Sequence, residues 1–267
     1  TGAGKTLAGF LPSLVALYER PPANTIRGPH TLYISPLKAL AVDIARNLEI
    51  PAREMELPIA IETRTGDTPA HKRQRQKLKP PDILLTTPEQ LALLVALPDA
   101  ERFFADLDTV VFDELHALVT NKRGDLLSLG LARLRKLRPG LRTVGLSATV
   151  SEPDDLRMWL MGQKEGAEPA LADLVTAPAG AKPEISILES VNRVPWAGHT
   201  TVYATDEIYA AIKAAKMTLI FVNARSQAER TFSELWRVNE EALPIALHHG
   251  SLDVAQRRRV EAAMAAG

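Results

Sequence analysis

Apolar residues along this chain follow two patterns that alternate. Short runs of four or five mostly apolar residues, typical of buried strands, occupy 31–35, 59–63, 83–86, 109–112 and 143–146. Between or after them, apolar positions recur at helical spacing over 7–18, 38–48, 88–97, 126–137 and 152–160. Strands that alternate with helices are typical of parallel sheets. We therefore predict an α/β domain with helices on both faces of a parallel sheet.

The alternation stops and then resumes, which predicts a second domain. Residues 162–183 are rich in Ala, Gly and Pro and show no period, as in a connecting segment. Candidate strands follow at 185–189, 218–222 and 244–247, with candidate helices at 206–215, 226–238 and 253–264. We predict a first domain over 1–175, a linker and entry segment over 176–205, and part of a second α/β domain over 206–267.

Composition and charge narrow the possible functions. The 32 Lys and Arg balance the 32 Asp and Glu, so nucleic-acid binding must come from local patches. The chain has no Cys, which excludes a disulfide framework, a Cys-ligated zinc site and an iron–sulfur cluster from this segment. The lack of Cys also agrees with a reducing cytoplasm. No uncharged apolar run is long enough to span a bilayer, so we expect no membrane partner.

The first residues have the composition of a phosphate-binding loop, namely Thr1, Gly2, Ala3, Gly4, Lys5 and Thr6. Glycines permit a tight turn whose N–H groups point at a phosphate. The Lys5 ammonium can reach the outer phosphates, and the Thr6 hydroxyl can bind Mg²⁺. The strict pattern needs a further glycine before Thr1, so we expect the chain to be truncated at this end.

The helix expected after this loop has an apolar face and an interior proline. Its apolar positions that fall on one face are Leu7, Phe10, Leu11, Leu14, Val15 and Tyr18. Pro12 lacks an N–H group and should kink the helix.

Two carboxylates follow the strand at 109–112. A strand packed beside the phosphate loop would deliver Asp113 to Mg²⁺, directly or through water. Glu114 would then orient and deprotonate an attacking water. A solvated acidic pair at a strand end is the plain alternative, and the presence of the loop disfavours it. These residues, with Lys5 and Thr6, predict one magnesium–triphosphate site.

The order of these motifs resembles that of superfamily 2 helicases of the DExH kind. Matching motifs stand at 1–6 (TGAGKT), 35–40 (SPLKAL), 65–67 (TGD), 86–89 (TTPE), 113–116 (DELH), 147–149 (SAT), 221–225 (FVNAR) and 248–251 (HHGS). Longer stretches at 32–48, 113–125 and 246–253 are similar to the large helicase-related (Lhr) family. Within it, the pattern resembles the ligase-associated branch.

The resemblance implies two RecA-like domains and an ATP-dependent helicase that moves 3′ to 5′ on single-stranded DNA in bacterial DNA repair, with a ligase and nucleases as partners. ATP would bind 1–6, and Mg²⁺ would bind Thr6 and Asp113. Lys5, Asp113 and Glu114 would be catalytic. The residues that would couple the state of the bound nucleotide to the binding of nucleic acid are His116, Ser147, Ala148 and Thr149. The implied nucleic-acid contacts are Pro36, Lys38, Thr65, Gly66, Asp67, Thr87, Pro88, Glu89, Asn223, Arg225, Gly250 and Ser251.

The resemblance also implies further parts after Gly267, including an arginine that stabilises the transferring phosphoryl group. We therefore expect the segment alone to unwind little DNA. A helicase for RNA or RNA–DNA hybrids stays open as a function, because phosphate contacts barely separate the polymers. So does a nucleotide-gated module that binds nucleic acid and recruits a partner without unwinding.

Several of these residues also have a simpler structural explanation that competes with the functional one. His116 is equally readable as an ordinary half-buried histidine, and the hydroxyls of 147–149 as turn caps. The basic run at 71–79 is better explained as a solvated helix face than as a nucleic-acid patch. Trp196 is better explained by packing than by base stacking. His248 and His249 would point to opposite faces of a strand, which disfavours a metal. The segment 121–125 follows the DELH motif and belongs to the family pattern, which implies a structural role or a DNA contact without deciding between them.

Overall fold

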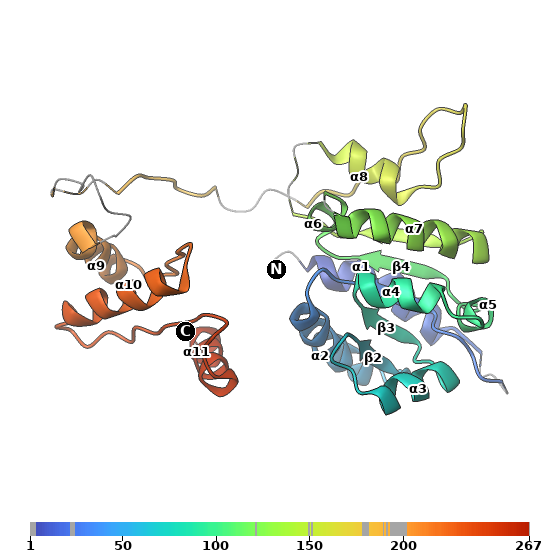
Figure 1. Ribbon diagram of the computed structural model, residues 1–267, viewed down its shortest axis with the longest axis horizontal. Coiled ribbons are helices and arrows are strands. Elements are labelled where there is room, and N and C mark those ends of the chain that lie inside the picture. The colour runs from blue at the N-terminus through green and yellow to red at the C-terminus, as the bar shows by residue number, and fades with distance from the viewer. Residues whose placement is uncertain are drawn as a thin grey trace. The chain divides into compact units, whose positions relative to one another are not determined.

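A computed structural model describes residues 4–21, 25–120, 122–148, 150, 152–177, 182–188, 190, 192 and 202–266. The chain divides into two compact units, Thr1–Pro178 and Ala179–Gly267 (Figure 1). Thr1, Gly2, Ala3, Thr149 and Trp196, which carried sequence predictions, lie outside the described residues.

The first unit is built on a five-stranded parallel sheet in the order β2-β3-β1-β4-β5. Its three inner strands are buried at every position, as expected of a sheet covered on both faces: β1 (Thr31–Ile34), β3 (Ile83–Thr86) and β4 (Thr109–Phe112). The edge strands β2 (Ile61–Arg64) and β5 (Arg142–Gly145) are only partly buried. The predicted parallel α/β architecture is confirmed.

Helices cover both faces, and each face has its own apolar core. One face carries α4 (Pro88–Val95), α5 (Ala100–Phe103), α6 (Leu115–Val119), α7 (Lys122–Leu137) and α8 (Pro153–Leu160). The other face carries α1 (Lys5–Tyr18) and α2 (Lys38–Glu54). Side chains of β1 alternate between the two cores, because successive residues of a strand point to opposite faces. α3 (Ala70–Leu78) carries much of the basic run, and its Arg75 and Gln76 bind Glu62 of the edge strand β2.

The buried face of α1 differs from the predicted one. The residues that pack are Gly9, Phe10, Ser13, Leu14 and Leu17, whereas Leu7, Leu11, Val15 and Tyr18 are exposed. Gly9 lies on the packed face, where a Cβ would lie 3.0 Å from the Leu146 side chain. The predicted face was therefore right at Phe10 and Leu14 and wrong at its other four positions. Pro12 lies inside α1, which continues to Tyr18.

The second unit contains the predicted helices without the predicted strands. The helices are η1 (Val202–Ala204), α9 (Thr205–Ala214), α10 (Arg225–Arg237) and α11 (Val254–Ala266). The strand predictions at 218–222 and 244–247 were wrong, and 185–188 is not a strand either. A strand needs a partner for its hydrogen bonds, and residues 202–266 form no ladder among themselves. The 218–222 segment is exposed, including Phe221 at 88%.

Candidate nucleotide and nucleic-acid sites

The carboxyl ends of all five strands lie on one edge of the sheet, because every strand pair is parallel. In doubly wound sheets this is the edge where ligands bind. The segments after β4 and β5 carry the candidate nucleotide residues. Those after β1, β2 and β3 carry the candidate nucleic-acid residues. The strand order makes the two sets neighbouring halves of the same edge.

Lys5 lies at the nucleotide half of this edge. Gly4, directly before it, has φ of +63°, a left-handed conformation that favours glycine, and α1 begins at Lys5. The free N–H groups of a first helical turn, which here includes Thr6, suit an anion. The Lys5 Nζ donates to the carbonyl oxygen of Ser147 at 3.0 Å, which places the ammonium just beyond β5.

Asp113 and Glu114 lie beside that position. The Asp113 N–H donates to the Ile34 carbonyl at 2.9 Å and continues the β1–β4 ladder. The Leu146 N–H donates to Phe112, and the Leu115 N–H donates to Leu146, so the segment holding Ser147 runs alongside the acidic pair. Asp113 is only 8% exposed, whereas Glu114 is half-buried. Lys5 and both carboxylates thus share one side of the sheet edge.

Tyr33 fixes the Asp113 carboxylate. The Tyr33 hydroxyl donates to Asp113 Oδ2, and the Glu114 N–H donates to Asp113 Oδ1 at 3.0 Å. Burial, then the bond to Asp113, raises the pKa of Tyr33 far above its ordinary value, so the hydroxyl keeps its proton and remains a donor. The Tyr33 ring also stacks on Phe10 of α1, with ring centroids 5.2 Å apart. Tyr33 therefore connects the helix that carries Lys5 to Asp113, directly after strand β4.

The side chains of this half fit a magnesium ion bound with a nucleotide. Mg²⁺ takes oxygen ligands and is usually held by one or two carboxylates together with substrate phosphates. Each Asp113 oxygen accepts one hydrogen bond described above and has a further lone pair to offer. Thr6 supplies a hydroxyl in the first turn of α1.

His116 joins the acidic motif to the segment after β5. Its Nδ1 lies 2.9 Å from Ser147 Oγ, and its Nε2 lies 3.6 Å from Glu114 Oε2. Ala148 follows Ser147 and is exposed. The geometry links two of the predicted coupling residues within the first unit, and their coupling role stays a prediction.

The nucleic-acid half contains an exposed ion pair. The Lys38 Nζ lies 2.9 and 3.0 Å from the two carboxylate oxygens of Asp67. A Cβ on Gly66 would lie 3.4 Å from the same ammonium, so the glycine leaves it room. Thr65 is buried, and its hydroxyl accepts the Asp67 N–H at 3.3 Å. Lys38 and Asp67, two of the predicted nucleic-acid contacts, are thus paired with each other. Thr65 stabilises the turn that contains Asp67.

The loops after β1 and β3 meet through a residue without an assigned role. Arg123 donates to both carboxylate oxygens of Glu89 and to the carbonyl of Pro36. Thr87 and Pro88 are buried at the start of α4, so their side chains shape this loop. Burial alone would raise the pKa of Glu89, but hydrogen bonds led by those from Arg123 hold it below its ordinary value.

In the second unit, the structure brings two predicted residues together. Arg225 begins α10, and its guanidinium donates to the hydroxyl of Ser251 in the turn before α11. Asn223 and Gly250 are exposed in the segments that precede these two residues. His248 lies 3.0 Å from Glu261, so the structure gives this histidine an acidic partner.

Comparison with known proteins identifies the family. A profile of DEAD/DEAH box helicases matches residues 1–156. The chain belongs to the DEAD/DEAH box helicase family. Within it, the chain is 36% identical over 264 residues to the Lhr helicase/probable uracil glycosylase of Mycolicibacterium smegmatis, covering 94% of this chain and 17% of that protein. It is 35% identical over 277 residues to the ATP-dependent helicase Lhr-Core protein 2 of Thermococcus barophilus, covering 98% and 32%.

Solved structures agree with this assignment. The helicase Lhr of Mycobacterium smegmatis, solved with ssDNA and AMP-PNP, superimposes with a TM-score of 0.73 at 35% identity over 98% of this chain and 35% of that chain. The DEAD-box helicase Mss116, at 20% identity and a TM-score of 0.68, shares the fold. The predicted RecA-like helicase fold is thereby confirmed. The chain spans 17–32% of the length of its curated Lhr relatives.

The sequence did not indicate the partners of two residues of this helicase fold. Tyr33 lies in a strand with the sequence TLYI, which reads as a buried strand and gives its hydroxyl no special signal. Arg123 lies in 121–125, for which the family resemblance left a structural role and a DNA contact open. Each acts through a partner distant in sequence, which local patterns do not record.

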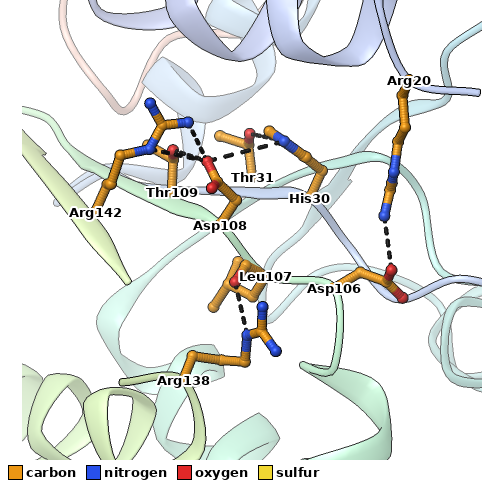
Figure 2. Close-up of polar contacts among 9 residues, drawn as sticks. All are labelled: Arg20, His30, Thr31, Asp106, Leu107, Asp108, Thr109, Arg138 and Arg142. Atoms are coloured by element: carbon orange, nitrogen blue, oxygen red, sulfur yellow. Dashed lines mark hydrogen bonds and ion pairs between the residues drawn. The ribbon is translucent and has the colours of Figure 1, made fainter. Parts of the chain in front are cut away.

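The opposite, amino-terminal edge of the sheet carries a separate polar network (Figure 2). Asp108 accepts hydrogen bonds from Arg142 and Thr109, which hold its pKa below the ordinary value even though burial opposes this. Arg20 of the segment after α1 pairs with Asp106 at 2.7 Å. With His30, whose Nε2 lies 3.9 Å from Asp108 Oδ2, these contacts join the starts of β1, β4 and β5 and lie away from the candidate sites. No helix in the described part of the chain has both the length and the apolar character to cross a membrane.

Proposed function

We propose that the chain contains the ATP-hydrolysing part of a helicase that holds single-stranded nucleic acid beside its nucleotide. The arrangement of the sheet edge is the observation that supports this most strongly. One half brings Lys5, Ser147, His116 and Glu114 into contact, and the adjoining half carries Lys38 and the loops around it.

The proposed chemistry assigns a task to each side chain. Lys5 exchanges the Ser147 carbonyl for the outer phosphates, because a phosphate is a stronger partner for an ammonium than a neutral carbonyl. Glu114 orients the attacking water and takes its proton. Asp113, held by Tyr33, presents its carboxylate to magnesium, which when bound neutralises charge between the phosphates.

The finer proposal concerns the polymer and the direction of movement. Similarity to Lhr, whose solved structure includes ssDNA, favours DNA as the substrate. The family resemblance adds 3′-to-5′ movement, a role in DNA repair, ligase and nuclease partners, and a bacterial cytoplasm. Asn223, Arg225, Gly250 and Ser251 are the proposed contacts to the strand from the second unit.

ATP hydrolysis by the full product of the gene, with and without single-stranded DNA, tests the proposal, because we expect the segment alone to hydrolyse ATP weakly or not at all. Glu114→Gln should lower the rate by about a hundredfold or more, since general base catalysis contributes roughly that much. Binding of a fluorescent ATP analogue should persist. Glu168→Gln, an exposed change outside the site, is the matched control. A Glu114→Gln variant that hydrolyses ATP at the wild-type rate would refute the assignment.

Unwinding requires a separate experiment. Because the chain spans a minor part of its relatives' length, duplexes with 3′ or 5′ overhangs should be tested on this chain and on the full product of its gene. Parallel DNA, RNA and hybrid duplexes identify the polymer. Binding without nucleic-acid-stimulated turnover would instead favour a recruitment module.

A further inference from the structure

We propose that Arg123 is a positioning residue that fixes the spacing of the two loops facing the nucleic acid after β1 and β3; this rests on the function proposed above. Its Nε and Nη2 donate to Glu89 Oε1 and Oε2 at 2.6 and 3.2 Å. Its Nη1 donates to the Pro36 carbonyl at 2.9 Å. One guanidinium thereby joins the segment after β1 to the first turn of α4.

The planar fork of arginine is what this geometry requires. Two donors match the two oxygens of Glu89, while a third points to Pro36. A lysine ammonium is a compact point charge on a flexible stem and cannot hold both partners in a fixed orientation. The contact therefore depends on shape as well as on charge.

Gly124 explains how Arg123 reaches this position. A Cβ on Gly124 would lie 2.5 Å from the carbonyl oxygen of Val119 and 2.6 Å from that of Leu118. Only a residue without a side chain lets the start of α7 approach the last turn of α6 so closely. Because α6 begins directly after Glu114, Arg123 follows the proposed catalytic base closely in the sequence.

A second path supports the same junction. Phe112, the last residue of β4, packs edge-to-face on Trp159 with ring centroids 5.0 Å apart. Trp159 Nε1 donates to Ser128 Oγ at 2.8 Å, and Ser128 Oγ donates to the Gly124 carbonyl at 2.9 Å. The first turn of α7 is thus anchored to β4, the strand that precedes Asp113.

Residues other than Arg123 supply most of the packing between α4 and α7. α4 and α7 pack through a fully buried core that includes Leu91, Leu94 and Leu131, and Arg133 binds the Val95 carbonyl at the far end of α4. The Arg123 and Glu89 side chains are 39% and 50% exposed, and exposed ion pairs contribute little stability. The contact instead sets the distance between loops that must match successive phosphates.

The test measures binding of a labelled oligothymidine by fluorescence anisotropy over a range of salt concentrations. Arg123→Lys and Arg123→Gln should each weaken binding by roughly threefold to thirtyfold, the range expected when coupling between sites is disturbed. The slope of log Kd against log salt should stay unchanged, because Arg123 holds protein groups and not phosphate. Affinity for a fluorescent ATP analogue should also stay unchanged. Arg133→Gln, at the other end of the same helix pair, is the control and should bind as the wild type does.

The outcomes are distinct. If lysine restores binding, or if the salt slope falls by about 0.7 as for one lost phosphate contact, Arg123 acts through its charge and the positioning role is overturned. Variants that bind like the wild type also overturn it and leave the proposed function intact. A wild-type chain that binds no nucleic acid overturns both. Should Arg123→Gln fold poorly, Glu89→Gln removes the same pair from the other side and must give the same loss.

Discussion

Removing the carboxylate of Asp67 should strengthen nucleic-acid binding, although the family resemblance places Asp67 among the strand contacts. In the structure, the Asp67 carboxylate lies against the Lys38 ammonium, where a phosphate oxygen would otherwise bind. A strand that uses Lys38 must first displace this internal partner. Asp67→Asn removes the competing charge and keeps the shape of the side chain.

The size of the effect follows from exposure. The Lys38 and Asp67 side chains are 54% and 76% exposed, so water and salt screen their attraction. Exposed pairs of this kind are worth about 0.2–1 kcal/mol, which corresponds to roughly a 1.4- to 5-fold gain in affinity when the competition is removed. The salt dependence should steepen by about 0.7 in slope if Lys38 gains a full phosphate contact.

Fluorescence anisotropy with the same oligothymidine measures both quantities. Asp173→Asn makes the same change of charge at an exposed position away from the sheet edge and corrects for net charge. If Asp67→Asn binds no more tightly than Asp173→Asn, the ion pair does not compete with the strand. If it binds more weakly than the wild type, Asp67 itself contacts the nucleic acid, and the reasoning from the ion pair is wrong.

Three further predictions concern the stability of the first unit. Tyr33→Phe removes a hydrogen bond to a nearly buried carboxylate and should lower the free energy of unfolding by about 1.5–3 kcal/mol at pH 7, measured by urea denaturation. Gly124→Ala should cost about 1–3 kcal/mol and weaken oligothymidine binding, because its Cβ would meet the Val119 carbonyl. Burial holds the pKa of His30 below its ordinary value despite the attraction of Asp108. The unfolded chain therefore binds this proton at a higher pH than the folded chain does. The free energy of unfolding should fall as pH drops below about 6.5. His30→Asn should make the melting temperature fall less steeply over the same pH range.

The sequence allowed the sheet to be predicted better than its surroundings. Inner strands of a parallel sheet are buried on both faces, so they appear as continuous apolar runs such as 83–86 and 109–112. The packing face of α1 was predicted only in part, because Gly9 and Ser13 pack there although they carry no apolar side chain. The strands predicted near 218–222 and 244–247 failed for another reason. Apolar runs indicate an extended segment, but a sheet also needs a neighbouring strand.

The candidate site was predictable where a motif places a residue at a strand end. Asp113 and Glu114 follow β4, and Ser147 follows β5, so the parallel topology alone brings them together. Tyr33 and Arg123 were not predictable in this way. Tyr33 reaches Asp113 across 80 residues, and Arg123 reaches Pro36 across 87, and such contacts exist only after folding.

Strand β1 belongs to both halves of the sheet edge. Tyr33 touches Asp113, and Pro36, only three residues later, touches Arg123. That interval is about 10 Å of extended chain, and pairing with β3 and β4 on either side prevents β1 from stretching or slipping. A substitution that shifts β1 to improve the nucleotide site therefore also shifts the loop that faces the nucleic acid. Nucleotide binding and nucleic-acid binding cannot be changed independently through this strand.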